Sequence, residues 1–290
     1  MATAREAAVR ADVLVEALPY IQRFRGAVVV VKYGGNAMVD PALATTFAED
    51  VVLMRSVGLR PVVVHGGGPQ ISDLMERLGK QPEFREGQRV TDAETVDIAR
   101  MVLVGKVNRD IVSAINVHAP LAVGVSGEDA GLITAGARDP ELGFVGNVEA
   151  VNPAILERLL AEELIPVVST IGADAQGQAY NINADAVAGA IAEAMSAEKV
   201  IYLTDIEGLL ADVDDAGSLI SRIDAPALHK LVDDGVLTGG MIPKIQACLH
   251  AVDNGVGSAH LLDGRVPHVV LLELFSDAGI GTMITPEAVP

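Results

Sequence analysis

Two lysines stand beside paired glycines, an arrangement that suits a bound phosphate group. Lys32 precedes Gly34 and Gly35 at the end of a β-branched run, and Lys244 follows a second glycine pair near the start of an apolar helical pattern. Glycines let backbone N–H groups approach an anion, and an ammonium group supplies the opposite charge. Taken alone, either lysine is equally typical of a solvated turn.

A run of three glycines, residues 66–68, follows His65 and is closed by a proline. Proline suits the first position of a helix, so the N–H groups of Gly67 and Gly68 are expected to form an anion cradle at a helix N-terminus. His-Gly-Gly-Gly also forms the oxyanion hole of esterases, which requires a G-x-S-x-G turn. The nearest such sequence, around Ser126, ends in glutamate, so we favour anion binding and interpret His65 as structural.

Polar residues mark the start of two further predicted helices. Arg89 lies in the sequence G-Q-R-V-T-D, where a guanidinium could grip a carboxylate through two parallel hydrogen bonds, or simply face solvent. Asn181, Asn183 and Asp185 precede an apolar helical segment. N-capping would explain Asn183 but leaves Asn181 without a role. A further cluster after a strand, Thr204, Asp205 and Gly208, is typical of a nucleotide-contacting loop.

Buried strands and helices that would position these residues alternate along the chain. Nearly continuous apolar runs predict strands at Ala27–Lys32, Pro61–His65, Leu121–Val125, Ile165–Thr170, Val200–Thr204 and Ser258–Leu262. Helical patterns lie at Pro41–Val57, Pro69–Leu78, Thr91–Val117, Asn183–Met195 and Pro243–Asn254, and Thr91 with Glu94 predicts a capping box. This alternation predicts an α/β protein with a mostly parallel sheet and helices on both faces. Ligands of such sheets bind beyond the carboxyl ends of the strands.

Composition narrows the function further. The 290 residues carry 21 basic and 39 acidic side chains, a net charge of −18, which disfavours nucleic acids and anionic membranes as partners. A single cysteine excludes an intrachain disulfide. No apolar run approaches the ~20 residues of a membrane span, and the N-terminus lacks a signal-peptide core, so we expect a soluble cytoplasmic protein. The sequence contains no Walker, G-x-G-x-x-G or H-E-x-x-H motif and no predicted metal ligands.

The first 25 residues differ from the rest. Ala7, Ala11, Leu14, Leu18 and Ile21 form a heptad seam, which Pro19 is expected to kink or break. Such a helix packs either on its own domain or on another subunit.

Six motifs in order, K-Y-G-G-N-A, H-G-G-G-P-Q, G-x-R-V-T-D, N-I-N-A-D, L-T-D-x-E-G and G-G-M-x-P-K, resemble the amino-acid kinase superfamily and, within it, the N-acetylglutamate kinase family. The match runs from about residue 8 to residue 285. G-x-R-V-T-D and N-x-N-A-D separate this family from the carbamate kinases and aspartokinases, which share only the glycine-rich start.

The resemblance implies an open, mainly parallel eight-stranded sheet in a three-layer αβα sandwich. It implies an N-terminal oligomerisation helix (1–25), an N-lobe that binds the acyl amino acid (26–175) and a C-lobe that binds ATP (176–290). The implied reaction is ATP-dependent phosphorylation of N-acetyl-L-glutamate to N-acetyl-L-glutamyl 5-phosphate in arginine biosynthesis. Magnesium would bridge the ATP phosphates with few protein ligands.

The resemblance also implies residue roles. Lys32 and Lys244 would stabilise the transition state, with Asp185 orienting both. The acyl amino acid would be held by Gly67, Gly68, Arg89, Asn181 and Asn183. Phosphoryl oxygens and ATP would be held by Gly34, Gly35, Gly67, Thr204, Asp205 and Gly208.

Arginine-inhibited members of the family carry a kinked N-terminal extension that joins dimers into a hexamer, and a C-terminal signature similar to residues 268–282 here. We therefore expect feedback inhibition by L-arginine and a trimer of dimers, with a regulatory site at Tyr20, His268, Glu273 and Gly279. Residues 268–284 could instead form only a final hairpin or strand. The alternatives for function are another kinase of the superfamily, such as an aspartokinase or carbamate kinase, and a non-catalytic arginine sensor.

Overall fold

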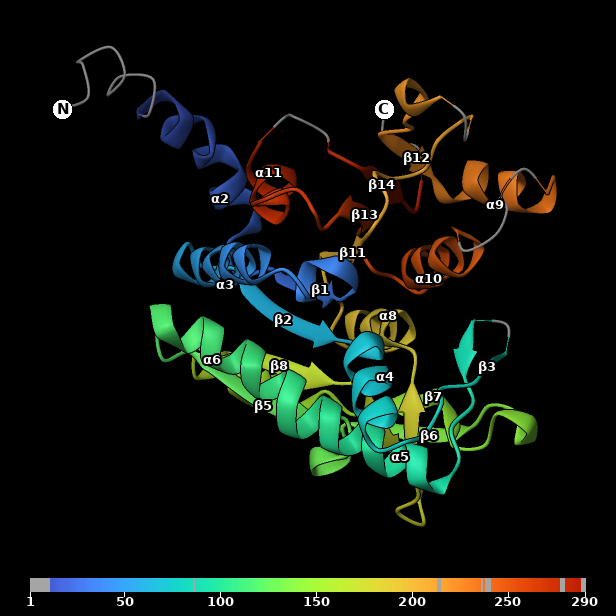
Figure 1. The fold of residues 1–290 in the computed structure, drawn as a ribbon. Coiled ribbons are helices and arrows are strands. Elements are labelled where there is room, and N and C mark those ends of the chain that lie inside the picture. Colours follow the sequence, from blue (N-terminus) through green and yellow to red (C-terminus); the bar gives the residue numbers. More distant parts are fainter. Residues whose placement is uncertain are drawn as a thin grey trace.

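An eight-stranded sheet forms the middle layer of the molecule (Figure 1). The computed structural model describes residues 11–85, 87–212, 215–235, 237, 241–276 and 280–287. The strand order is β12-β14-β13-β11-β1-β2-β8-β5, and only the β13–β14 pairing is antiparallel. The strands are β1 (Val28–Tyr33), β2 (Arg60–His65), β5 (Ala122–Ser126), β8 (Ile165–Ser169), β11 (Lys199–Thr204), β12 (Arg222–Asp224), β13 (Ala259–Asp263) and β14 (Thr282–Thr285). The expected, mainly parallel sheet is confirmed.

Helices cover both faces of this sheet. One face packs against α2 (Leu18–Phe24), α3 (Pro41–Ser56), α4 (Gly68–Arg77), α5 (Ala93–Arg100), α6 (Asn108–His118) and α11 (Val269–Phe275). The other packs against α7 (Ala154–Ala161), α8 (Ala184–Ala194), α9 (Ala225–Asp233) and α10 (Met241–Asp253). Within β1, Val29 and Val31 join one core while Val28 and Val30 join the other. Burial on both faces explains the uninterrupted apolar runs, and the three-layer fold is confirmed.

Further strands, which the apolar runs did not predict, form two smaller sheets apart from the eight-stranded one. β6 (Ile133–Ala137), β7 (Val145–Val151), β9 (Ile171–Ala173) and β10 (Ala179–Ile182) form a closed four-stranded unit. A two-stranded hairpin joins β3 (Phe84–Arg85) to β4 (Gln88–Arg89). These strands are short and mix glycine with polar residues, so no apolar run marks them. They matter because β4 and β10 carry Arg89 and Asn181.

The predicted helix over Thr91–Val117 has a different start and an irregular middle. Asp92, not Thr91, is the N-cap, and its carboxylate accepts the Thr95 N–H at 2.8 Å. The hydroxyl of Thr91 instead donates to the Arg89 carbonyl at 2.8 Å, so the predicted capping box is wrong. Between α5 and α6 the segment Met101–Val107 is π-helical, a geometry that is frequent at functional sites.

The N-terminal segment breaks where proline predicts. Residues 11–16 are helical, Ala17 forms a turn, and Pro19 occupies the first turn of α2. Leu14 and Leu18 of the predicted seam are 74% and 48% exposed, whereas Ala7 lies outside the described residues. No helix in the described part of the chain is long and apolar enough to cross a membrane. The lobe division near residue 175 stays a prediction, and the sheet runs continuously across it.

Candidate functional site

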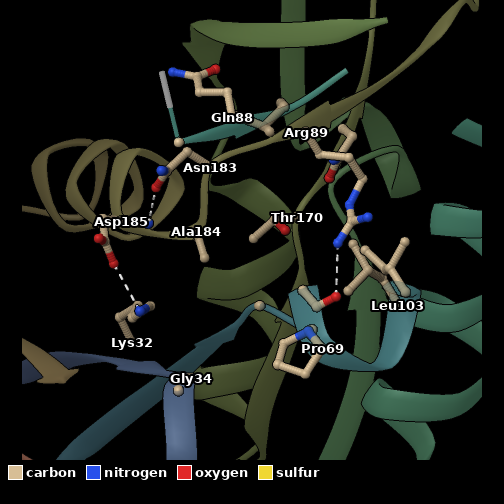
Figure 2. A pocket seen from close by; sticks show the side chains of 18 of the residues that line it. Lys32, Gly34, Pro69, Gln88, Arg89, Leu103, Thr170, Asn183, Ala184 and Asp185 are labelled. Carbon is tan, nitrogen blue, oxygen red and sulfur yellow. Dashed lines mark hydrogen bonds and ion pairs between the residues drawn. The ribbon is translucent and has the colours of Figure 1, made fainter. Parts of the chain in front are cut away.

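The carboxyl ends of three neighbouring strands open into one cavity of about 270 Å³ (Figure 2). Tyr33 of β1 pairs in register with His65 of β2, and His65 pairs with Ser169 of β8. The next residue of each strand lines the cavity, namely Gly34, Gly66 and Thr170. This is the edge of a parallel sheet where ligands bind. Nine predicted site residues line the cavity: Lys32, Gly34, Gly35, Gly67, Gly68, Arg89, Asn181, Asn183 and Asp185.

At one side of the cavity, the Lys32 ammonium lies 3.0 Å from the Asp185 carboxylate, with both side chains largely buried (Figure 2). Asp185 occupies the first turn of α8, where the positive end of the helix dipole favours a carboxylate. Asn183 is the N-cap of α8 and accepts the Asp185 N–H at 2.7 Å, so the capping role expected for this residue is confirmed. The cap holds Asp185 where it can orient the lysine.

At two positions in the cavity wall, the neighbouring side chains leave room only for glycine. Gly35 has φ +68, and a Cβ there would lie 2.8 Å from a carboxylate oxygen of Asp205. A Cβ on Gly67 would lie 2.6 Å from Leu103 of the π-helical segment. Larger residues at either position would collide with these groups. The exposed backbone is therefore available to an anionic ligand.

At another part of the cavity, Arg89 is 7% exposed and held by neutral partners. Its guanidinium donates to the Gly68 carbonyl at 2.9 Å and the Ser72 hydroxyl at 2.8 Å, and it lies 4.7 Å from the centre of the Phe84 ring. Burial lowers its pKa. Within the described residues no carboxylate comes within ion-pair distance of it. A buried cation without an ionic partner suits an anionic ligand.

Lys244 lies in the first turn of α10, which packs against α8, and does not line this cavity. Asp185 and Lys244 nevertheless both influence the pKa of the buried Cys248 thiol. Burial raises this pKa, the negative charge of Asp185 raises it further, and the positive charge of Lys244 lowers it. The structure therefore brings Lys244 toward the helix that carries Asp185.

The other residues predicted to contact ATP follow β11. The Thr204 hydroxyl donates to the carbonyls of Ile206 and Leu262 at 3.1 and 3.3 Å, which shapes the strand exit. The Asp205 carboxylate lies against Gly35. Gly208 has φ +147 and packs against Thr282. Asp205 therefore lies next to Gly35, which lines the cavity, but Asp205, Thr204 and Gly208 do not line it themselves.

Glu273 and His268, two of the predicted regulatory residues, have different hydrogen-bond partners. Glu273 accepts a hydrogen bond from Nδ1 of the buried His260 at 2.8 Å, and Nε2 of His260 accepts one from Lys199 at 3.0 Å. His268 pairs instead with Asp50 at 2.6 Å. Burial lowers the pKa of Lys199 to about 8. A basic residue at the start of a buried strand was the signal that could have pointed to Lys199.

The N-terminal helix α2 borders the hydrogen-bonded chain of Lys199, His260 and Glu273, which we call the Glu273 network. The centre of the Phe24 ring, in α2, lies 5.1 Å from the Lys199 ammonium. Tyr20 is partly buried and packs against the hydrophobic core that contains Phe24. Gly279 lies outside the described residues. Residues 268–284 contain α11 followed by the start of β14, so the expectation of only a hairpin or strand is wrong.

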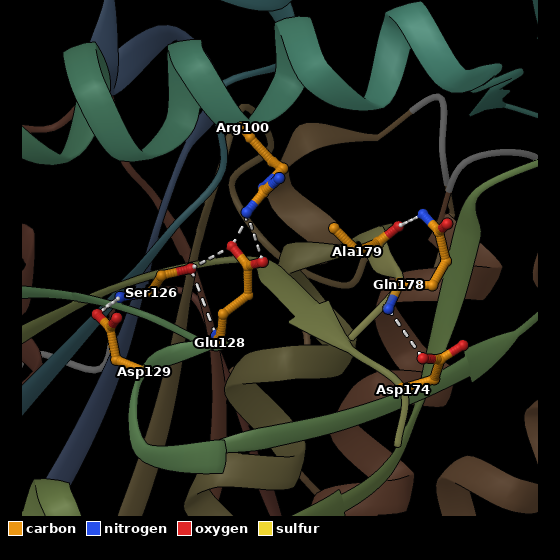
Figure 3. Close-up of polar contacts among 7 residues, drawn as sticks. All are labelled: Arg100, Ser126, Glu128, Asp129, Asp174, Gln178 and Ala179. Atoms are coloured by element: carbon orange, nitrogen blue, oxygen red, sulfur yellow. Dashed lines mark hydrogen bonds and ion pairs between the residues drawn. The ribbon is translucent and has the colours of Figure 1, made fainter. Parts of the chain in front are cut away.

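The serine that an esterase would need is engaged elsewhere. Ser126 is 4% exposed, and its hydroxyl donates to the Glu128 carboxylate at 3.5 Å, which in turn pairs with Arg100 at 2.9 Å (Figure 3). His65 is fully buried and accepts a hydrogen bond from Asn108, and burial lowers its pKa to about 4. The structural interpretation of His65 is confirmed.

Sequence reasoning missed several residues that line the cavity, namely Phe84, Gln88, Leu103 and Thr170. The turn after β9 leads into β10, the strand that carries Asn181. Asp174 accepts the backbone N–H groups of Gln176 and Gln178, both at 2.9 Å, and thereby closes the hairpin that leads to Asn181. Figure 3 shows the contact with Gln178. In the sequence, Thr170 continues the apolar strand pattern, so nothing there marks it as a site residue.

Comparison with known proteins defines the class of this fold and site. The chain belongs to the amino acid kinase family, which it matches over residues 27–263. It is a kinase, 55% identical over 287 residues to the acetylglutamate kinase of Saccharopolyspora erythraea, covering 97% of this chain and 94% of that protein. The resemblance to that family is confirmed.

Solved structures of N-acetylglutamate synthase from Neisseria gonorrhoeae share the fold. The complex with coenzyme A and N-acetyl-glutamate aligns with a TM-score of 0.84 at 25% identity, covering 96% of this chain and 64% of the synthase. The complex with coenzyme A and L-arginine aligns with a TM-score of 0.80. This chain therefore spans less than two thirds of the synthase's length.

Proposed function

We propose that this kinase transfers the γ-phosphoryl group of ATP to the side-chain carboxylate of N-acetyl-L-glutamate, a step of arginine biosynthesis. The observation that carries the proposal is the placement of two cations, Lys32 and Arg89, at different parts of one cavity. A dicarboxylate substrate needs one cation at the reacting carboxylate and another at its α-carboxylate. The name of the relative from Saccharopolyspora erythraea supports the same reaction.

In this reaction a carboxylate oxygen forms a bond to the γ-phosphorus while the bond from that phosphorus to the ADP oxygen breaks. The protein has to align the reactants and neutralise charge on the transferred group. Lys32, oriented by Asp185, neutralises that charge, and backbone N–H groups of the glycine turns hold the phosphoryl oxygens. Lys244 acts from the α10 side, while Arg89 and Asn181 hold the acyl amino acid.

The nucleotide lies over the exit of β11, beside Asp205 and the Gly208 turn. Among the described residues no three acidic, histidine or cysteine side chains gather into a metal cluster. This donor set fits a magnesium ion held mainly by the nucleotide's own phosphate oxygens, with Asp205 as the carboxylate nearest the glycine turn. When bound, the ion supplies positive charge to the phosphates.

A coupled ADP-release assay tests the activity. We expect turnover with N-acetyl-L-glutamate and far slower turnover with L-aspartate or carbamate. Faster turnover with either of these would assign the enzyme to another branch of the superfamily. Arginine binding without turnover of any substrate would favour the sensor alternative.

We also propose that L-arginine inhibits the enzyme at the Glu273 network. Glu273 is the carboxylate there that a guanidinium could pair with, and its side chain is 11% exposed beside α2. The arginine complex of the related synthase supports this ligand class. Millimolar L-arginine is expected to inhibit the wild type and to inhibit Glu273→Gln much less, with Glu157→Gln on the exposed face of α7 as the matched control. Insensitivity of the wild type would contradict the proposal.

The same N-terminal region supports a hexamer, a trimer of dimers. Val13, Leu14 and Val15 are 59%, 74% and 66% exposed, an apolar surface that a second helix would cover. Light scattering is expected to give a hexamer for the full chain and a smaller species for Leu14→Glu. A wild-type dimer would overturn this assignment.

A further inference from the structure

We propose that Thr170 binds the substrate directly, with its hydroxyl hydrogen-bonded to the acylated amino group. This inference rests on the proposed function. Thr170 is the residue that follows β8, in the same row beyond the sheet as Gly34 and Gly66. Of these three residues only Thr170 has a side chain, so its hydroxyl is the one polar side-chain group that this row presents to the cavity.

The side chain of Thr170 lines the cavity and has no hydrogen-bond partner among the described residues. The residue is 2% exposed and lines the cavity, and its side chain makes no hydrogen bond to any residue that the structure describes. Its backbone carbonyl is used, since it accepts the Ile182 N–H at 3.0 Å. A hydroxyl that faces a ligand cavity and makes no hydrogen bond within the described protein is free to donate to, or accept from, a bound ligand.

The position of Thr170 identifies which part of the substrate it meets. In Figure 2 its side chain lies between the Lys32–Asp185 pair and Arg89, and all four residues line the same cavity. The proposed function places the reacting carboxylate at Lys32 and the α-carboxylate at Arg89. The α-carbon, with its acylated amino group, then lies between them. A neutral hydroxyl can accept a hydrogen bond from the N–H of an amide or donate one to its carbonyl oxygen.

The neighbouring residue supplies a matched control. Ser169 is fully buried, and its hydroxyl also has no partner among the described residues, yet Ser169 does not line the cavity. Ser169→Ala therefore removes an unpartnered buried hydroxyl from the neighbouring position, which does not line the substrate cavity. Removing the Thr170 hydroxyl as Thr170→Val keeps the shape of the side chain, because valine has nearly the same shape as threonine.

The test compares Thr170→Val, Thr170→Ser and Ser169→Ala in the ADP-release assay. A neutral hydrogen bond is worth a factor of roughly 3 to 10 in affinity. We expect Thr170→Val to raise the KM for N-acetyl-L-glutamate by that factor, with the KM for ATP and the thermal midpoint unchanged. Thr170→Ser is expected to restore most of the affinity, and Ser169→Ala to leave it unchanged.

Two results would overturn the inference. One is an unchanged KM for N-acetyl-L-glutamate in Thr170→Val. The other is a lower thermal midpoint together with equal changes in both KM values, which would indicate a structural hydroxyl. A wild-type enzyme that does not turn over N-acetyl-L-glutamate would instead reject the proposed function, so the two failures are distinguishable.

Discussion

The Lys32 ammonium and the Asp185 carboxylate lie 3.0 Å apart, although one belongs to β1 and the other to α8, far along the chain. The strand places the lysine at the carboxyl edge of the sheet, and the Asn183 cap places the aspartate at a helix N-terminus. The pair therefore depends on the packing of α8 against β1. The ion pair therefore fixes the position of the Lys32 ammonium group in the cavity.

Removal of either candidate transition-state lysine is expected to slow the chemical step. Lys32→Ala and Lys244→Ala should each lower kcat by roughly 10²-fold or more, on the scale of losing one oxyanion-stabilising donor. Steady-state kinetics with both substrates saturating measures this. Lys230→Ala, on the exposed face of α9, is the control. Normal turnover in both site variants would remove the assignment.

The role of Asp185 is expected to depend on Lys32. If Asp185 acts by orienting the ammonium, Asp185→Asn should lower kcat roughly 10-fold or more in the wild type but have little further effect in Lys32→Ala. A double-mutant cycle in kcat measures this coupling. Independent, multiplicative effects would show that Asp185 does not act through this lysine.

Loss of the Arg89 guanidinium is expected to weaken substrate binding. Arg89→Ala should raise the KM for N-acetyl-L-glutamate by roughly 10- to 100-fold, the range of a lost hydrogen bond to a charged group, with a smaller change in the KM for ATP. Arg85→Ala is a close control, since Arg85 belongs to the same hairpin but pairs with Glu83 and Glu141 in an exposed position. Equal KM values for the two variants would exclude Arg89 from substrate binding.

Burial of His65 is expected to make the protein less stable in acid. Its pKa is lowered from 6.5 to about 4 in the folded state, so the unfolded chain binds a proton more readily between these values. As the pH falls from 6.5 toward 4, this group lowers the free energy of unfolding by about 3 kcal/mol.

His65→Gln retains a donor and an acceptor for Gly66 and Asn108 without titrating. The free energy of unfolding, measured by urea denaturation between pH 7 and pH 4.5, should therefore fall less steeply in the variant than in the wild type. A parallel pH dependence in the two proteins would show that this histidine does not control acid stability.

Local sequence patterns were enough to predict the layered fold and nine of the residues that line the cavity. Strands buried on both faces must be continuously apolar, so β1, β2, β5, β8, β11 and β13 were all recognisable. Glycine pairs and the Asn183 cap were recognisable because backbone geometry restricts which residues can occupy such positions. These signals are local in the chain.

Which side chains contact one another follows from the folded arrangement of strands and helices. Thr170 ends an apolar run like any strand residue, and it is a candidate site residue because the register of β1, β2 and β8 places it in one row with Gly66 and Gly34. The contact of Glu273 with His260, and that of His268 with Asp50, likewise joins distant segments. Contacts of this kind depend on strand order and helix packing, which residue types along the chain do not encode one position at a time.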